Sequence, residues 1–217
     1  PAMSQADDLL RSYLEADRIL RAARMAFLAQ GETPDGIAAL AAGVDRGFAD
    51  KESEDGGSAL MRIADVLVDI ANADAAKLLF KILGHEEPEV RVSAGEALME
   101  LLYDRFAEVA RIIEAEIDRG GNAVALAEVP FILAEVGEPG GVKIVTKLLK
   151  HADAEVVGAA IEGLAAMGDP TALKALEPLK NDKRKVTMEE DDENAGEVTI
   201  GELAGEAIEH LRGLQRA

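Results

Sequence analysis

EVRVSAGEALMEL, residues Glu89 to Leu101, is the segment that decides the fold, because its pattern recurs along the chain. Its apolar residues fall at i, i+4, i+7, i+8 and i+11, which is one stripe of a helix with 3.6 residues per turn. Four other segments place uncharged residues at the same spacings, beginning at Ala59, Ala125, Val156 and Ile200. Successive copies begin 31, 35, 31 and 44 residues apart. This period is typical of a solenoid built from helix pairs.

A longer repeat supports the short one. The segments KLLFKILGHEEPEVRVSAGEAL (77–98) and KIVTKLLKHADAEVVGAAIEGL (143–164) carry the same residue at nine positions. Each indicates a first helix, a short turn and a second helix. Gly137 and Gly168 fall where a helix end favours a left-handed residue, and Pro139 and Pro170 follow where the helix cannot continue. The sequence therefore predicts repeated pairs of helices with both ends of the second helix marked.

The motifs EPEVR, AGEAL and GDP, at residues 87–91, 94–98 and 168–170, open, fill and follow the second helices. This combination resembles the HEAT repeats, in particular the bilin-lyase-like repeats of bacterial type, over roughly residues 35–214. The resemblance implies an all-α fold, a right-handed α-α superhelix. It also implies that the second helices line a concave surface, which in this family commonly binds another protein.

We expect a single solenoid domain of about five helix pairs over residues 1–217. Residues 1–34 are predicted to form an N-terminal capping helix, with Leu10, Tyr13, Leu14, Leu20, Ala23 and Phe27 on its apolar face. Residues 35–217 hold the repeats, interrupted by an acidic insertion at 181–198. The insertion is either a solvated excursion or a functional loop. Pro130 either kinks or delays its helix, or serves packing alone.

The chain is acidic, with a net charge of −19, and it contains no cysteine. Because its basic residues cluster only at 180–185, a nucleic-acid partner is not expected. Neither a signal peptide nor an apolar run long enough to span a membrane is present, which favours the cytoplasm. The acidity has two explanations. It can serve solubility or adaptation to salt, or it can attract a basic partner surface.

Four kinds of chemistry were tested against the residues. Residues 191–202 match a calcium-binding loop only in part, because Ala195 supplies no side-chain oxygen. The His-Glu pairs of HEAT-like di-iron hydroxylases are replaced by Val92-Ser93 and Gly158-Ala159. Base excision would need a basic groove with aromatic residues, and the surroundings of the three histidines suggest no catalytic triad. We therefore expect no catalytic residue, no metal and no cofactor, with His85 and His151 serving as turn caps or lying exposed.

A binding surface is the remaining prediction. We expect a non-catalytic scaffold or adaptor that receives a basic or amphipathic helical segment of a partner protein on its concave face. The alternatives are a bilin-lyase-like enzyme or chaperone acting on a tetrapyrrole-carrying protein, and self-association along the ends of the solenoid. The oligomeric state stays open. The candidate partner-binding residues lie between the apolar stripe positions of the second helices: Arg91, Glu96, Met99, Glu100, Glu128, Glu135, Glu162, Glu202 and Glu206.

Overall fold

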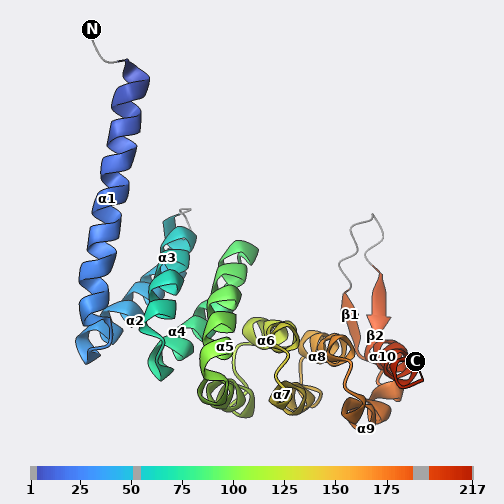
Figure 1. The fold of residues 1–217 in the computed structure, drawn as a ribbon. Helices are drawn as coiled ribbons and strands as arrows, with labels where there is room; N and C mark the ends of the chain where they lie inside the picture. Colours follow the sequence, from blue (N-terminus) through green and yellow to red (C-terminus); the bar gives the residue numbers. More distant parts are fainter. Residues whose placement is uncertain (1–3, 51–54, 188–195, 217) are drawn as a thin grey trace.

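The computed structural model describes residues 4–50, 55–187 and 196–216. These residues form a row of helices with one short two-stranded hairpin near the C-terminal end (Figure 1). The helices and strands in chain order are α1 (Gln5–Gly31), α2 (Pro34–Ala49), α3 (Asp55–Ile70), α4 (Ala73–Leu83), α5 (Pro88–Asp118), α6 (Ala123–Val136), α7 (Gly140–Leu148), α8 (Ala154–Met167), η1 (Pro170–Ala172), α9 (Leu173–Leu176), η2 (Glu177–Asn181), β1 (Lys185–Thr187), β2 (Glu197–Thr199) and α10 (Ile200–Leu214).

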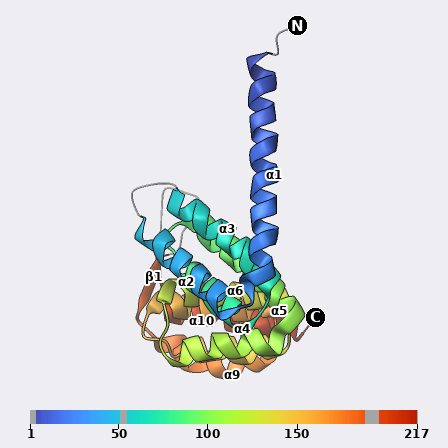
Figure 2. The ribbon, with the colours of Figure 1, turned by 90° about the vertical axis from the view of Figure 1, so that its left-hand side faces the viewer.

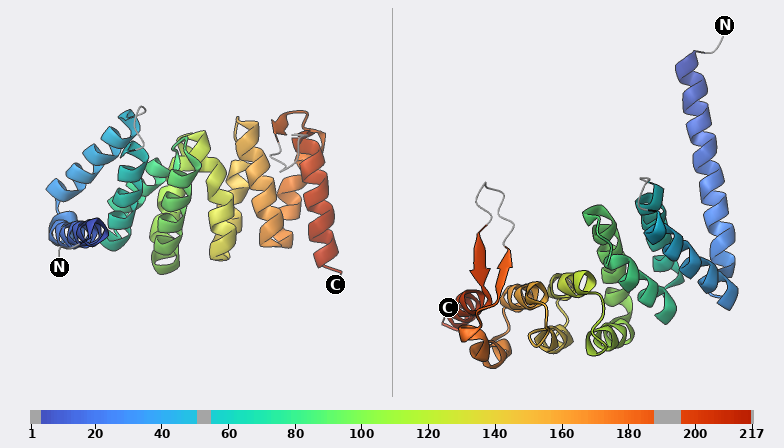
Figure 3. Two further views of the ribbon diagram at one scale, coloured as in Figure 1. Left: turned by 90° about the horizontal axis from the view of Figure 1, so that it is seen from above. Right: turned by 180° about the vertical axis from the view of Figure 1, so that it is seen from behind.

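The helices pair as the repeat pattern predicts. The pairs are α2 with α3, α4 with the first part of α5, the second part of α5 with α6, α7 with α8, and α9 with α10. Each second helix also packs against the next one, so that α3, α5, α6, α8 and α10 follow one another along the row (Figure 3). The fold is therefore an all-α, HEAT-like solenoid, as predicted.

The repeated apolar stripe forms the core of the solenoid. In the copy that begins at Val90, all five stripe residues are buried, and the copies at Ala125, Val156 and Ile200 are buried at four or five positions. The copy assigned to Ala59 is correct only in part. Leu67 and Ile70 are buried as predicted, Ile63 and Val66 are half-buried against the core, and Ala59 is exposed. Leu60 and Ala64 are fully buried as well, and they belong to a register one residue later that is also uncharged.

The N-terminal helix is confirmed, with Ser4 and Asp7 forming the capping box that opens it. Only its last turns contact the solenoid. Phe27 and Leu28 pack on the core, and Arg24 pairs with Asp69 of α3. The rest of α1 stands away from the stack (Figure 2), and the apolar face predicted to cap the solenoid is exposed at Leu10, Tyr13, Leu14 and Leu20.

Repeats two and three share α5. Arg105 is the one residue inside this helix with non-helical backbone angles, φ −139° and ψ 43°. The helix changes direction there, and its second part becomes the first helix of the third pair (Figure 1). The sequence places the same boundary between Tyr103 and Ala107 but predicts two separate helices.

Proline has two different effects in the second half of the chain. Helix α6 begins at Ala123 and continues through Pro130, whose buried ring packs against Gly163 of α8. Because Pro130 lies inside the helix, a start delayed by the proline is wrong, and its contact with Gly163 agrees with the packing explanation. In contrast, the helix expected over residues 171–180 is broken into η1, α9 and η2. Pro178 contributes to this break, because it has no backbone N–H to donate to the residue four positions earlier.

Gly137 and Gly168 end α6 and α8 in the left-handed conformation, with φ of 70° and 68°, as predicted. The insertion is partly ordered: Lys185–Thr187 pairs antiparallel with Glu197–Thr199, with Val186 opposite Val198. The acidic run at 189–193 lies outside the described residues. Among the described residues, no helix combines the length and apolar character needed to cross a bilayer.

Candidate functional site

A hollow on the second helices lies over α6 and α8. One part of it, of about 340 Å³, is bounded by α6, α8 and strand β1, and an adjoining part, of about 560 Å³, extends to the start of α5. The two parts share Ala127, Glu128 and Glu155, so we treat them as one feature, the α6–α8 groove. In Figure 1, α6 and α8 lie between the first part of α5 and the hairpin, both of which rise above them.

The floor of the groove is formed by residues at equivalent positions of α6 and α8. Ala127 and Gly158 each lie two residues after the first stripe position of their helices, and Phe131 and Glu162 each lie six residues after it. These positions are one turn apart on the face opposite the buried stripe. Because alanine and glycine leave the backbone of both helices close to the surface, the exposed Phe131 ring, with 44% of its surface accessible, stands on a low apolar floor.

An ion pair closes the α5 side of the groove. The Arg91 guanidinium donates from Nε to Glu128 Oε1 at 2.8 Å, and from Nη1 to the carbonyl oxygens of His85 and Glu86 at 3.1 and 2.7 Å. Arg91 therefore holds the turn before α5 while also fixing the Glu128 carboxylate of α6. With both side chains half-buried, this contact joins two repeats at the edge of the groove.

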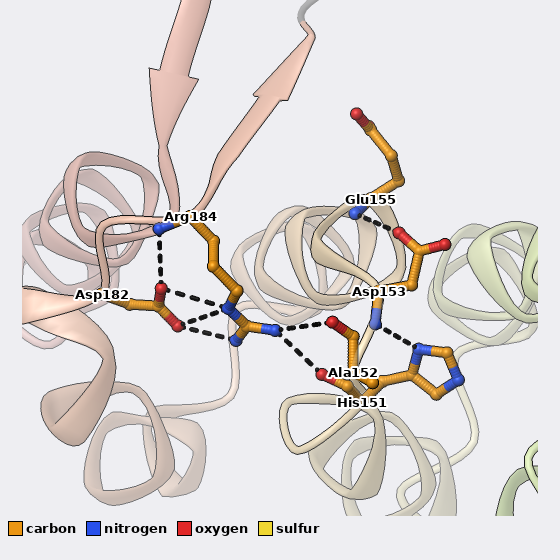
Figure 4. A network of polar contacts seen from close by, with 6 residues as sticks. All are labelled: His151, Ala152, Asp153, Glu155, Asp182 and Arg184. Carbon is orange, nitrogen blue, oxygen red and sulfur yellow. Dashed lines mark hydrogen bonds and ion pairs between the residues drawn. The ribbon is translucent and has the colours of Figure 1, made fainter.

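A second arginine closes the opposite side (Figure 4). Arg184, at the base of β1, donates from Nη1 to the carbonyl oxygens of His151 and Ala152 at 3.0 and 3.1 Å. Its Nε and Nη2 donate to the Asp182 carboxylate. This contact lowers the pKa of Asp182. His151 and Ala152 occupy the same repeat position as His85 and Glu86, so each turn is held by an arginine, although Arg184 comes from a later repeat.

The hairpin becomes a wall of the groove through two further contacts. Val186 packs on Gly158, where an added Cβ would lie 3.2 Å from the valine side chain. The Thr187 backbone N–H donates to Glu155 Oε1 at 3.1 Å. Because Gly158 has no side chain, β1 can approach α8 closely, and its residues Val186 and Thr187 line the groove.

The electrostatics of the groove are set by Glu155 and Glu162. Partial burial of Glu162 raises the pKa of its carboxyl, and the negative charge of Glu155 raises it further. None of the described residues supplies a positive charge that lowers this pKa again. The groove therefore combines an exposed aromatic ring with a carboxylate whose charge is poorly compensated by the protein itself.

Each of the two turn histidines accepts a hydrogen bond from its own turn. His85 Nδ1 accepts the Glu87 backbone N–H at 3.2 Å, and His151 Nδ1 accepts the Asp153 N–H at 3.1 Å. The turn-capping explanation of these two residues is thus confirmed. Over the described ranges, no group of three His, Cys, Asp or Glu side chains could hold a metal ion. Asp191 and Glu193 of the calcium-loop comparison lie outside those ranges.

The predicted partner-binding residues fall into two groups. Arg91, Glu128 and Glu162 line the groove or close its edge. The others do not line it, and their predicted role stays untested: Glu96, Glu100, Glu135 and Glu206 are exposed, Met99 is half-buried against the core, and Glu202 serves in the capping box with Thr199 at the start of α10.

Sequence reasoning missed Phe131, Glu155 and the hairpin residues. For Phe131 a signal was present, because it occupies the same repeat position as Glu96 and Glu162, where a large apolar side chain has no core to fill. Glu155 precedes the stripe of α8 by one residue, so its position was also readable. In contrast, the docking of β1 depends on the contact between Val186 and Gly158, which no spacing reveals.

Comparison with known families bears on this same region. Residues 110–189 match the HEAT repeats. The match runs from the second part of α5 past β1, includes the groove floor, and supports a HEAT-repeat family for this solenoid. A crystal structure of an engineered protein aligns with 88% of this chain and 90% of its own, at 19% identity and a TM-score of 0.34. No curated protein matches the chain.

Proposed function

We propose that this HEAT-like protein is a non-catalytic scaffold or adaptor that binds a basic or amphipathic helical segment of another protein in the α6–α8 groove. The observation that carries the proposal is the pairing of an exposed Phe131 with the Glu155 and Glu162 carboxylates over a floor of alanine and glycine. Exposed aromatic residues of this kind are typical anchors of protein interfaces.

The chemistry of the groove selects the partner. The pKa of Glu162 is raised, so its ionised carboxylate is poorly stabilised by the protein. A lysine or arginine placed between Glu155 and Glu162 would supply a positive charge that stabilises it. An apolar side chain one helical turn away on the partner would reach Phe131. The net charge of −19 would favour the approach of a basic segment from a distance.

An affinity capture from host lysate at low and high salt, with matched variants, tests the proposal. Glu155→Gln/Glu162→Gln and Phe131→Ala are the groove variants, and Glu138→Gln/Glu209→Gln is the control, with the same change of charge at exposed positions outside the groove. We expect a specific protein that is retained at low salt, weakened at high salt and lost only from the groove variants. Equal recovery by the groove and control variants would show that the groove is not the binding surface.

The finer assignment to the bilin-lyase-like repeats, and with it action on a tetrapyrrole-carrying protein, stays a separate prediction. An absorbance scan of the purified protein for a bound pigment tests it.

A further inference from the structure

Helix α1 exposes a concentration of apolar side chains that the groove does not use. Of the twelve large hydrophobic residues exposed in the described chain, seven lie on α1: Leu9, Leu10, Tyr13, Leu14, Ile19, Leu20 and Met25. Scattered exposed hydrophobic residues are ordinary on a protein surface, but seven within 17 residues of one helix are an unusual concentration. The helix is 27 residues long, or about 40 Å, and Figures 1 and 2 show most of it without a neighbour.

The uncharged residues of α1 have the spacing of a coiled-coil seam. Steps of three and four residues lead through Ala6, Leu9, Tyr13, Ala16, Leu20, Ala23 and Phe27, which we call the α1 seam. At its lower end, Phe27 packs on the solenoid core. The seam therefore continues from a covered position into an uncovered one. Large and small residues alternate along most of it, so that a partner helix could approach at the alanines.

The charges of α1 identify the partner. Residues 5–17 carry four acids and one arginine, a net charge of −3, whereas residues 18–31 carry three arginines and no acid, a net charge of +3. Two copies laid antiparallel bring the negative half of each helix beside the positive half of the other. A parallel pair would place like charges together. Such a pattern is complementary to itself under a two-fold rotation, which is the symmetry of most homodimers.

Other occupants fit this helix less well. Helices that lie on membrane surfaces are usually rich in lysine and arginine on their polar face. Helix α1 has no net charge, and the chain around it carries −19. Two ion pairs lie within α1, Arg18 with Glu15 and Arg21 with Asp17. Both are exposed and contribute little to stability, so these side chains can exchange partners.

We propose that α1 is a dimerisation arm, which packs through the α1 seam, antiparallel, against α1 of a second copy of this chain. Ser4 and Asp7 cap the helix at its outer end, so the arm presents its seam as formed helix rather than as a frayed terminus. This assignment is independent of the groove, because α1 packs on α2 and α3, whereas the floor and wall of the groove come from α6, α8 and β1.

Sedimentation equilibrium of the full chain, with two matched variants, tests the arm. Leu9→Glu changes the seam, and Met25→Glu changes the face of α1 opposite the seam, and both side chains are 65% exposed. We expect the wild type to dimerise reversibly and Leu9→Glu to raise the dissociation constant about a hundredfold or more, because the dimer loses two buried leucines. Met25→Glu should leave the dissociation constant within about threefold of the wild type, which is under 1 kcal/mol. Circular dichroism should show unchanged folding in both.

Cysteine cross-linking tests the orientation, since the chain has no cysteine of its own. Ala16→Cys lies near the middle of the α1 seam and should form a disulfide across the two-fold axis, whereas Ala6→Cys, at the end of the same seam, should not. Equal cross-linking of both variants would mean a parallel pair. A wild type that stays monomeric at every concentration overturns the proposal. If that monomer instead floats with vesicles of phosphatidylcholine and phosphatidylserine, α1 is a membrane-binding helix.

Discussion

The contact between Gly163 and Pro130 yields the sharpest prediction about stability. A Cβ added at Gly163 would lie 2.5 Å from the Pro130 Cβ, closer than real Cβ atoms approach, and 3.1 Å from its Cα, which is tight. At Gly205, in α10, an added Cβ meets nothing within 4 Å. Both glycines lie inside helices, so Gly→Ala gains about the same 1 kcal/mol of helix propensity at either position. The two substitutions therefore differ mainly in packing.

We expect Gly205→Ala to raise the free energy of unfolding by about 0.5–1 kcal/mol. Gly163→Ala should carry an overpacking cost of about 1–3 kcal/mol against the same gain, so it should lie about 1–3 kcal/mol below Gly205→Ala. Urea denaturation followed by circular dichroism measures the difference, and thermal melts should separate the variants by about 2–4 °C per kcal/mol. If Gly163→Ala is as stable as Gly205→Ala, the close packing of α6 on α8 is not what requires this glycine.

Three further substitutions test the site and its supports. Glu162→Gln should stabilise the protein at neutral pH, because folding raises the pKa of Glu162 above its ordinary value of 4.5; in a series of melts against pH the gain should vanish as the pH falls below that value. Arg184→Lys should lower the free energy of unfolding by about 1 kcal/mol in urea titrations, because an ammonium group cannot serve both turn carbonyls and Asp182 as the guanidinium does. Asn122→Ala should cost about 1 kcal/mol in the same titrations, since its side chain accepts from two backbone N–H groups at the start of α6.

The core of the solenoid was predictable because burial repeats with the helical period. Val90, Ala125 and Val156 could be aligned by spacing alone, and each proved to be buried. The copy at Ala59 was correct only in part, because two neighbouring registers, one starting with alanine and one with leucine, satisfy the same uncharged pattern. Periodicity locates a stripe, but the packing of the neighbouring helix decides which of two adjacent residues enters the core.

The candidate site was less predictable, because it is formed by contacts between repeats. Glu128 and Glu162 could be placed on the outer face from their spacing within single helices. The groove around them also requires Arg184, which holds the hairpin base to a turn some thirty residues earlier in the chain, and Gly158, which lets β1 approach. For helix α1, the apolar face could be predicted from the sequence. Whether the solenoid covers that face could not be predicted, because this depends on contacts with other helices.

The joint at Arg105 has a mechanical consequence. Other neighbouring helices in the row are joined by connections such as the four residues 119–122, whereas the two parts of α5 meet at a single non-helical residue. A rotation between the first two repeats and the remaining three would therefore change the backbone angles of Arg105. Because Arg91 lies on one side of this pivot and Glu128 on the other, such a rotation widens or narrows the α6–α8 groove. The Arg91–Glu128 ion pair bridges the two parts, so the same rotation would also stretch or break this contact.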